Sequence, residues 1–265
     1  MIDPLHLALG GVSGVLVGFA LGLVGGGGSI LAVPLMVYLV GVKSPHVAIG
    51  TSALAVAVNA ATGLFQHARA GDVRWPCGLT YAAFGVMGAL AGSTLGKSFD
   101  GQKLLFLFAL LMLGVGTLML RSRKEAGTPG VRLGRDNAPR LIAYGLGTGA
   151  FSGFFGIGGG FLIVPGLIAS TDMMMINAVG TSLVAVTAFG LATAANYAAS
   201  GLVDWLLAGV FITGGVAGGL IGTRLSHRLS AGGQLKTVFA MLIFAVAFYM
   251  LFKSGQALWG SSPGA

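Results

Sequence analysis

The sequence predicts an all-α, polytopic membrane protein with eight to ten transmembrane helices, arranged as two inverted repeats with glycine-broken helices. Three observations support this fold class. Of the 265 residues, 55% are hydrophobic and 8% charged, and the mean hydropathy is +0.90, whereas soluble domains carry about 25% charged residues. The apolar runs are continuous, unlike the alternating strands of a membrane barrel. The third observation is an internal repeat.

Ten apolar segments are separated by polar gaps. They cover residues 5–24, 30–41, 47–68, 76–96 and 104–120, and then 141–156, 161–170, 175–199, 205–223 and 237–252. A complete crossing needs about 17 to 25 residues, so 30–41 and 161–170 are either half-helices or parts of longer helices. The basic stretch 121–140 contains Gly and Pro and predicts a flexible linker. We therefore expect a first membrane repeat at 1–120, a basic cytoplasmic linker at 121–140 and a second membrane repeat at 141–265.

The two halves repeat the same residues at a nearly constant spacing. With an offset of 131 residues, the stretch Gly14–Pro34 matches Gly145–Pro165 in glycines, apolar residues and the final proline. With an offset of 130, the Gly-Thr-Ser at 50–52 falls on the Gly-Thr-Ser at 180–182. The match runs through most of each half, which indicates the duplication of one structural unit.

The relative direction of the halves depends on whether each glycine run turns the chain back. If it does, each half has five segments, and a cytoplasmic linker places 11 lysines and arginines inside and 4 outside. If each run only kinks one long crossing, the division is 9 inside to 6 outside. Cytoplasmic gaps carry an excess of Lys and Arg, so the charges favour the inverted arrangement, with both chain ends outside.

Many of the glycines recur at helical spacing. The pattern Gly14-xxx-Gly18-xxx-Gly22 is typical of helices that pack closely against one another in lipid. We interpret these glycines as packing positions. The same interpretation covers Gly145, Gly149, Gly153, Gly85, Gly88, Gly92, Gly215, Gly218 and Gly222.

Two denser runs, "GLVGGGGSILAVP" at 22–34 and "GFFGIGGGFLIVP" at 153–165, do not fit that role. Glycine costs about 1 kcal/mol per residue relative to alanine in a helix, so consecutive glycines are expected to unwind it. Unwound backbone at membrane depth lies where protein buries it or where it lines an aqueous cavity. Half-helices would then begin at Ser29 or Ile30 and at Phe161.

The N-termini of such half-helices attract anions, and transporters use broken helices of this kind near the midplane. We therefore predict that the two half-helix N-termini approach each other across one anion site. The alternative is a purely structural break. The candidate binding residues in the two runs are Gly27, Gly28, Ser29, Gly158, Gly159 and Gly160.

Polar residues follow each break on the next apolar segment. On segment 47–68, three of them are spaced by seven residues and therefore share one helical face. The candidate substrate ligands are the hydroxyls of Thr51, Ser52, Thr181 and Ser182 and the amides of Asn59, Gln66 and Asn196. The hydroxyls of the repeated Gly-Thr-Ser are the best placed. Interhelical hydrogen bonding is an equally good explanation of such a polar stripe.

Charged residues restrict the chemistry at membrane depth. All seven Asp and Glu residues, and all Lys and Arg residues, fall outside the middle of the apolar segments, so the usual proton-relay carboxylate is absent. The remaining donors are hydroxyls, amides and backbone N–H groups, which suit an anion and suit a divalent cation poorly. His67, near the end of its segment, is a further candidate for the site or for proton coupling; the alternative is a structural histidine.

Several function classes are disfavoured. The basic residues lie in short gaps, as the positive-inside rule expects, rather than on a nucleic-acid-binding face. The single cysteine, Cys77, excludes a disulfide framework and a cysteine-ligated metal cluster. No Walker lysine, helical His/Glu metal pair or nucleophile–base pair is present, so we expect no enzyme, no catalytic residue, no metal and no cofactor. The N-terminus lacks a basic n-region and does not resemble a cleaved signal peptide.

These motifs resemble the TauE/SafE family of membrane permeases, often called sulfite exporters. The resemblance rests on the breaks followed by proline at Gly25–Pro34 and Gly156–Pro165, and on the Gly-Thr-Ser after each, and it covers nearly the whole chain. It implies a multi-pass protein of the cell (inner) membrane that carries a sulfur-containing anion. The first break reads Gly-Gly-Gly-Gly-Ser where the second reads Gly-Ile-Gly-Gly-Gly, so the two halves need not contact the substrate equally.

The expected function is a secondary transporter that exports sulfite or a small organosulfonate, such as sulfoacetate, by alternating access. A negative interior drives an anion outward, because one elementary charge crossing 100 mV is worth about 2.3 kcal/mol; export therefore needs no proton relay. The alternatives are a passive anion channel and a permease for another sulfur-containing anion such as thiosulfate. The expected partners are this anion and the lipid bilayer, and a homodimer is left open.

Overall fold

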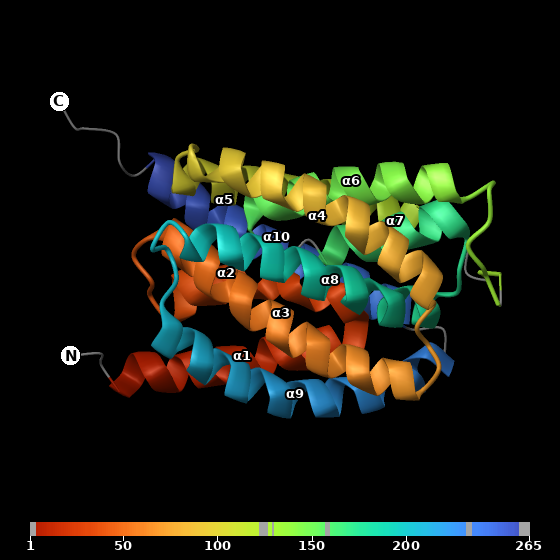
Figure 1. The fold of residues 1–265 in the computed structure, drawn as a ribbon. Coiled ribbons are helices and arrows are strands. Elements are labelled where there is room, and N and C mark those ends of the chain that lie inside the picture. The colour runs from red at the N-terminus through yellow and green to blue at the C-terminus, as the bar shows by residue number, and fades with distance from the viewer. Residues whose placement is uncertain (1–3, 122–126, 129, 157–159, 232–234, 260–265) are drawn as a thin grey trace.

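The computed structural model describes residues 4–121, 127–128, 130–156, 160–231 and 235–259, and every named element in this part of the chain is a helix. The all-α prediction is therefore confirmed. The elements are α1 (Pro4–Val24), η1 (Gly25–Leu31), α2 (Ala32–Pro34), η2 (Leu35–Leu39), α3 (Pro45–Arg69), α4 (Trp75–Lys97), α5 (Gly101–Arg121), α6 (Ala138–Phe155), α7 (Gly160–Thr171), α8 (Met175–Ala198), α9 (Trp205–Ala231) and α10 (Leu235–Trp259). Figure 1 shows the long helices lying side by side along one direction.

Five helical stretches of the described residues are long and apolar enough to cross a membrane. They are Pro4–Leu39, Pro45–Arg69, Trp75–Lys97, Met175–Ala198 and Trp205–Ser226. Three shorter apolar helices accompany them, at Gly101–Thr117, Leu162–Thr171 and Ile243–Lys253. The chain is thus built as a multi-pass membrane protein, and its helices coincide with the apolar segments of the sequence to within a few residues, apart from the longer C-terminal ends of α9 and α10.

The first glycine run reverses the chain. Gly25 follows α1 with φ of +64°, in the left-handed region that glycine adopts without strain. A straight helix from His6 to Gly41 would separate these residues by about 50 Å, yet a side chain on Gly41 would contact the His6 ring. The segment η1–α2–η2 therefore returns along α1.

The glycines after this turn are not unwound, contrary to expectation. They form the 3₁₀ helix η1, so helical backbone resumes at Gly25 rather than at Ser29 or Ile30. The absence of side chains lets η1 fold back closely onto α1, since a Cβ on Gly28 would overlap the backbone of Ala20 and Leu21. Close packing thus compensates for the poor helix propensity of glycine.

The second glycine run makes an equivalent turn. Gly156 ends α6 with φ of +66°, and α7 starts at Gly160, one residue before the expected Phe161. A side chain on Gly166 of α7 would contact Thr148 of α6, so α7 returns along α6. Residues 157–159 lie outside the described residues.

Glycine ladders join two pairs of long helices. On α1, three glycines spaced by four residues lie against the backbone of α9. In the same way, glycines of α4 and of α6 lie against the backbone of the partner helix. The contacts are Gly14–Phe211, Gly18–Gly215, Gly22–Gly219, Gly88–Leu146, Gly92–Ala150, Gly149–Gly85 and Gly153–Ala89. Because a Cβ at these positions would overlap partner backbone, the packing interpretation of the ladders is confirmed.

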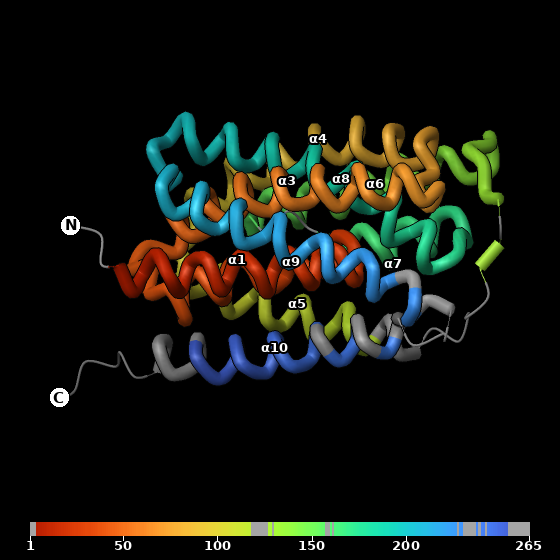
Figure 2. Tube along the Cα trace, turned by 90° about the horizontal axis from the view of Figure 1, so that it is seen from below, coloured from red at the N-terminus to blue at the C-terminus, as the bar shows by residue number. Residues whose placement is uncertain are grey.

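The pairs α1–α9 and α4–α6 occupy equivalent positions in the two halves of the chain. Between them, α3 and α8 pack against each other, where Gly190 lies against Ala53 and Ala57. The remaining equivalent helices, α5 and α10, lie together at one edge (Figure 2).

The two halves begin at opposite ends of the bundle (Figure 1). At the end where α1 starts, His6, Val42 and Asp204 line one cavity; we name this the α1 end. At the opposite end, the α6 end, Val73 at the start of α4 and Val131, which precedes α6, line another. The last described helix, α10, ends toward the α1 end (Figure 1).

Candidate functional site

The two glycine turns meet inside the protein. A Cβ on Gly26 would lie 2.7 Å from the Cα of Gly160, and a Cβ on Gly160 would overlap the Gly26 carbonyl. Segments from opposite halves of the chain thus touch through the backbones of Gly26 and Gly160. Only glycine permits this approach.

Two serine hydroxyls accept from N–H groups of these turns: Ser29 links the first turn to the second, and Ser182 links the first turn to α8. Ser29 Oγ donates to the carbonyl of Gly26 (2.8 Å) and accepts from the N–H of Gly160 (3.3 Å). Ser182 Oγ donates to the carbonyl of Val179 (2.7 Å) and accepts from the N–H of Gly26 (2.9 Å). Both serines are fully buried. Each hydroxyl therefore satisfies an N–H group at a helix start, where the helix offers no acceptor. We name Gly26, Ser29, Gly160 and Ser182 the glycine junction.

Other candidates from the glycine runs and from α3 have different surroundings. Gly27 is buried in η1, and Gly28 faces α1. Ser52 donates to the carbonyl of Ile49 (3.0 Å), as Ser182 does to Val179, and the Ile49 side chain packs where a Cβ on Gly156 would lie. Ser52 thus bonds to the residue of α3 that packs against the second turn. Gly158 and Gly159 lie outside the described residues.

The two threonine hydroxyls bind loops rather than the junction. Thr51 Oγ1 accepts from the N–H of Asp204 (2.9 Å), and Thr181 Oγ1 accepts from the N–H of Arg74 (2.9 Å). Thr51, in the first half, therefore fixes the residue before α9 of the second half. Thr181, in the second half, fixes the residue before α4 of the first half. The residues of the repeated Thr-Ser thus have different partners. Ser182 bonds to the glycine junction, whereas Thr51 and Thr181 bond to loops.

The amides of the polar stripe are dispersed. Asn196 Oδ1 accepts from Lys97 Nζ (2.8 Å) and its Nδ2 donates to Ser93 Oγ (2.5 Å) near the α1 end. Gln66 Nε2 donates to the Thr62 carbonyl (3.4 Å) within α3. These bonds match the interhelical and local roles that polar residues play in membrane helices.

Asn59, at the middle of α3, differs from the other amides. It is 3% exposed, and neither its Oδ1 nor its Nδ2 has a hydrogen-bond partner among the described residues. Its side chain occupies the place of a Cβ on Gly215 of α9. A buried amide without partners costs about 1 to 3 kcal/mol, which makes Asn59 a candidate for contact with a transported molecule.

His67 belongs to a buried polar cluster at the α6 end. Its Nδ1 lies 2.7 Å from Asp72 Oδ2, and its Nε2 lies 3.4 Å from the carbonyl oxygen of Gly22 in the last turn of α1. The ring is fully buried. The imidazole thus links the α3–α4 turn to the helix that ends at the first glycine run.

Sequence reasoning missed the partners of this cluster. Asp72 lies in a polar gap, yet it is only 8% exposed, because the turn at Gly71, with φ of +79°, folds it back onto α3. Asn177 Nδ2 donates to the Asp72 carbonyl (2.9 Å). The five-residue spacing of His67 and Asp72 across a glycine is the one sequence signal of this pair. Among the described residues, no group of three His, Cys, Asp or Glu side chains could hold a metal ion.

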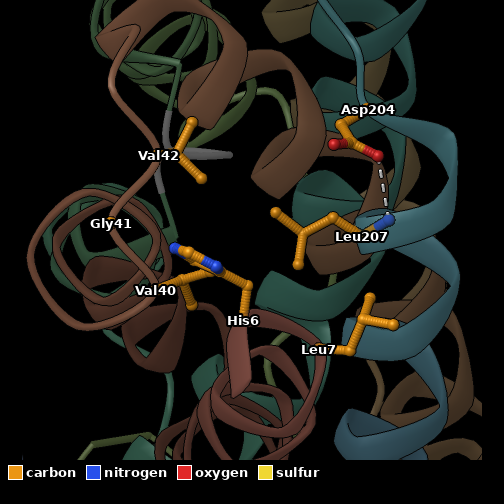
Figure 3. Close-up of a pocket in the computed structure, with 7 residues that line it drawn as sticks. All are labelled: His6, Leu7, Val40, Gly41, Val42, Asp204 and Leu207. Atoms are coloured by element: carbon orange, nitrogen blue, oxygen red, sulfur yellow. Dashed lines mark hydrogen bonds between the residues drawn. The ribbon is translucent and has the colours of Figure 1, made fainter. Parts of the chain in front are cut away.

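A cavity of about 180 Å³ opens at the α1 end (Figure 3). It lies between His6 and Leu7 of α1, the turn at Gly41, and the start of α9. Asp204 Oδ1 accepts from the N–H of Leu207 (3.0 Å) and so caps α9. The cavity includes no residue of the glycine junction.

Comparisons with known proteins give one family model and several membrane transporters. The family model described as "Sulfite exporter TauE/SafE" matches residues 11–250. A "probable membrane transporter protein" of Xylella fastidiosa (strain Temecula1) is 51% identical over 263 residues, covering 97% of this chain and 98% of the relative. The probable membrane transporter proteins YdhB and YunE of Bacillus subtilis are 26% and 27% identical, over 81% and 86% of this chain and 88% and 89% of their own lengths. No solved structure matches.

Proposed function

Because the chain belongs to the TauE/SafE sulfite exporter family of membrane transporters, we propose that it exports sulfite or a small organosulfonate, such as sulfoacetate, by alternating access. Residues 1–120 and 141–265 act as two inverted repeats, joined by a cytoplasmic linker at 121–140. The substrate binds at the glycine junction, and transport involves no catalytic step.

The observation that carries this proposal is the pair of N–H groups held by serine hydroxyls. The N–H groups of Gly26 and Gly160 come from opposite halves, and each donates to a serine oxygen. Hydrogen bonds to an ionised acceptor are roughly twice as strong as those between neutral groups. An oxyanion can therefore replace the serine oxygens as acceptor, and the rotated serine O–H groups of Ser29 and Ser182 become further donors to it.

Burial of the junction supports alternating access over an open channel. Ser29 and Ser182 are fully buried, so an anion reaches them only after helices move apart. The tightly packed pairs α1–α9 and α4–α6 suit rigid units that rock about the central helices α3 and α8. Each pair contains one helix from each half of the chain, so each moving unit is a bundle drawn from both repeats. Rocking of one bundle against another around a fixed midplane site is a known mechanism of inverted-repeat transporters.

The junction is uncharged, which suits an export driven by the membrane potential. An anion that binds there carries its own charge through the field, and leaving a cell with a negative interior is worth about 2.3 kcal/mol per charge per 100 mV. An ionised carboxylate at the junction would repel the same substrate.

The test is flux from proteoliposomes under a set potential. We expect saturable efflux of sulfite or sulfoacetate that accelerates as the compartment facing the linker becomes more negative. Thiosulfate, sulfate and chloride serve as comparison anions. Flux of every sulfur anion equal to that of empty vesicles would refute the proposal, and a current that does not saturate would replace the transporter with a channel.

Serine variants connect flux to the junction. Ser29→Ala and Ser182→Ala are expected to raise the KM for the exported anion about tenfold, the loss of about 1.4 kcal/mol that one hydrogen bond to an anion supplies. Ser13→Ala is the matched control, because Ser13 is fully buried in α1 and its hydroxyl has no partner among the described residues. An unchanged KM in both junction variants would move the site elsewhere.

A further inference from the structure

A second cavity, of about 490 Å³, opens at the α6 end and includes no junction residue. Its walls are Val73–Cys77, at the start of α4, and Gly130–Leu133, in the segment before α6. Two charged side chains belong to this lining, Arg74 and Arg132, and both are cationic. No ion pair joins either guanidinium to a carboxylate among the described residues.

The guanidinium of Arg74 has few partners. Its one side-chain hydrogen bond within the described residues is a long contact of 3.5 Å from a terminal nitrogen to Asn177 Oδ1, and its Nε is buried without a partner. The backbone of Arg74 is nevertheless fixed, because its N–H donates to Thr181 Oγ1 (2.9 Å). A partly buried, positioned arginine without a counter-charge is costly unless an anion binds beside it.

The equivalent position in the second half carries a helix cap that the start of α4 lacks. With the offset of 130 residues, Arg74 corresponds to Asp204. Asp204 Oδ1 accepts from the N–H of Leu207 and caps α9, whereas Arg74 precedes α4 and no side chain caps this helix. The start of α4 therefore has a cationic side chain where α9 has an anionic one. An external anion would supply the absent acceptor and also meet the positive end of the helix dipole.

We propose that the cavity between the start of α4 and Gly130–Leu133 is a binding site for a small oxyanion, held by Arg74 and Arg132. The proposal rests on the proposed function, because it assigns this site to the transported anion as it arrives at the α6 end, before it reaches the glycine junction. Planar guanidinium groups match sulfonate, sulfite and phosphate oxygens. The phosphate group of an anionic lipid offers the same chemistry, and the experiment separates the two sources.

Trp75 provides a direct readout, since it lines the cavity and is 44% exposed. In a protein with Trp205→Phe and Trp259→Phe, Trp75 is the only tryptophan. Sodium sulfite added to this protein in a phosphate-free detergent is expected to change the Trp75 fluorescence in a saturable way. Arg132→Gln should weaken this binding about tenfold or more, as expected for the loss of one charge-assisted hydrogen bond.

Arg74→Asp is the sharpest variant, because it gives α4 the capping residue that α9 already has. It should abolish the fluorescence response while the unfolding temperature stays equal or rises. Asp204→Asn, at the equivalent position of the other end, is the matched control and should leave the response unchanged.

Phosphatidylglycerol added to the detergent distinguishes the sources. A response to sulfite that Arg74→Asp removes supports the site with the free anion as ligand, and a response to phosphatidylglycerol alone supports it with a lipid headgroup as ligand. No response to either, or equal responses in the Arg74→Asp variant, overturns the proposal. Flux keeps the two proposals apart: a Trp75 response in a protein that moves no sulfur anion would refute the proposed function and leave this site standing.

Discussion

Backbone N–H groups and serine hydroxyls, rather than charged side chains, form the centre of this protein at the residue scale. Ser29 and Ser182 each donate to one carbonyl and accept from one N–H group of a glycine turn. Such groups have no water to bind when buried, so each lost partner costs more than the bond itself contributes.

Ser182→Ala should therefore destabilise the protein. The change leaves the buried N–H of Gly26 without an acceptor, and we expect a loss of about 1 to 3 kcal/mol in the free energy of unfolding. The measurement is reversible denaturation in detergent, with Ser13→Ala as the control, since that hydroxyl has no partner to lose among the described residues. Equal stability of the two variants would contradict the junction geometry.

The pair of His67 and Asp72 allows a second test at this scale. Their side chains lie 2.7 Å apart and are buried, so their energies should be coupled. A double-mutant cycle with His67→Ala and Asp72→Ala is expected to show about 1 to 3 kcal/mol of coupling. Additive effects of the two changes would mean that the contact contributes nothing to stability. The control pair is Gln66→Ala with Asp72→Ala, because no hydrogen bond joins the described side chains of these two residues.

At the scale of the helices, glycines perform two different tasks. In α1, α4, α6 and α9 they let two helices approach until their backbones touch, which is how helices associate in lipid without a hydrophobic driving force. At Gly25 and Gly156 they supply the left-handed conformation that turns the chain back. The spacing distinguishes the two tasks. One small residue in each helical turn allows close packing, and a run of consecutive glycines reverses the chain.

Two glycines of α9 test the packing task. A Cβ on Gly218 would overlap the backbone of Val15 in α1, whereas one on Gly209 would meet nothing within 4 Å. Gly218→Ala should therefore push α1 and α9 apart and cost about 1 to 3 kcal/mol, as overpacking does. Gly209→Ala should be neutral or stabilising by up to about 1 kcal/mol, because alanine is the better helix former. Thermal unfolding in detergent compares them, and equal effects would refute the ladder.

At the scale of the whole molecule, the two halves begin at opposite ends of the bundle (Figure 1), and the cavities at these ends differ in the charge of their linings. The cavity at the α6 end is lined by Arg74 and Arg132, and the one at the α1 end by Asp204 and His6. The equivalent residues Arg74 and Asp204 thus carry opposite charges, which favours anion capture in the cavity at the α6 end over the cavity at the α1 end.

Membrane topology gives a test at this scale. In a Cys77→Ala background, Gly130→Cys should react with a membrane-impermeant thiol reagent only from the cytoplasmic side, because the basic linker is expected inside. Lys43→Cys, at the exposed turn of the α1 end, should react only from the outside. Labelling of both positions from one side would contradict the inverted arrangement.

The sequence by itself determined the membrane class, the positions of the helical segments, the duplication and the glycine ladders. These depend on composition and on spacing along one helix, both of which a single chain displays directly. The family resemblance rested on the same short motifs, and the family match over residues 11–250 agrees with it.

Only the tertiary structure decided which polar groups meet. Thr51 and Ser52 are neighbours in sequence, yet Thr51 binds the loop before α9 while Ser52 bonds to Ile49 within α3. Asp72 is buried although its sequence context is a polar gap. Side chains on adjacent helical residues point about 100° apart, and the partner each one meets is set by helices distant in sequence. That arrangement is a property of the packed bundle, so no local pattern could specify it.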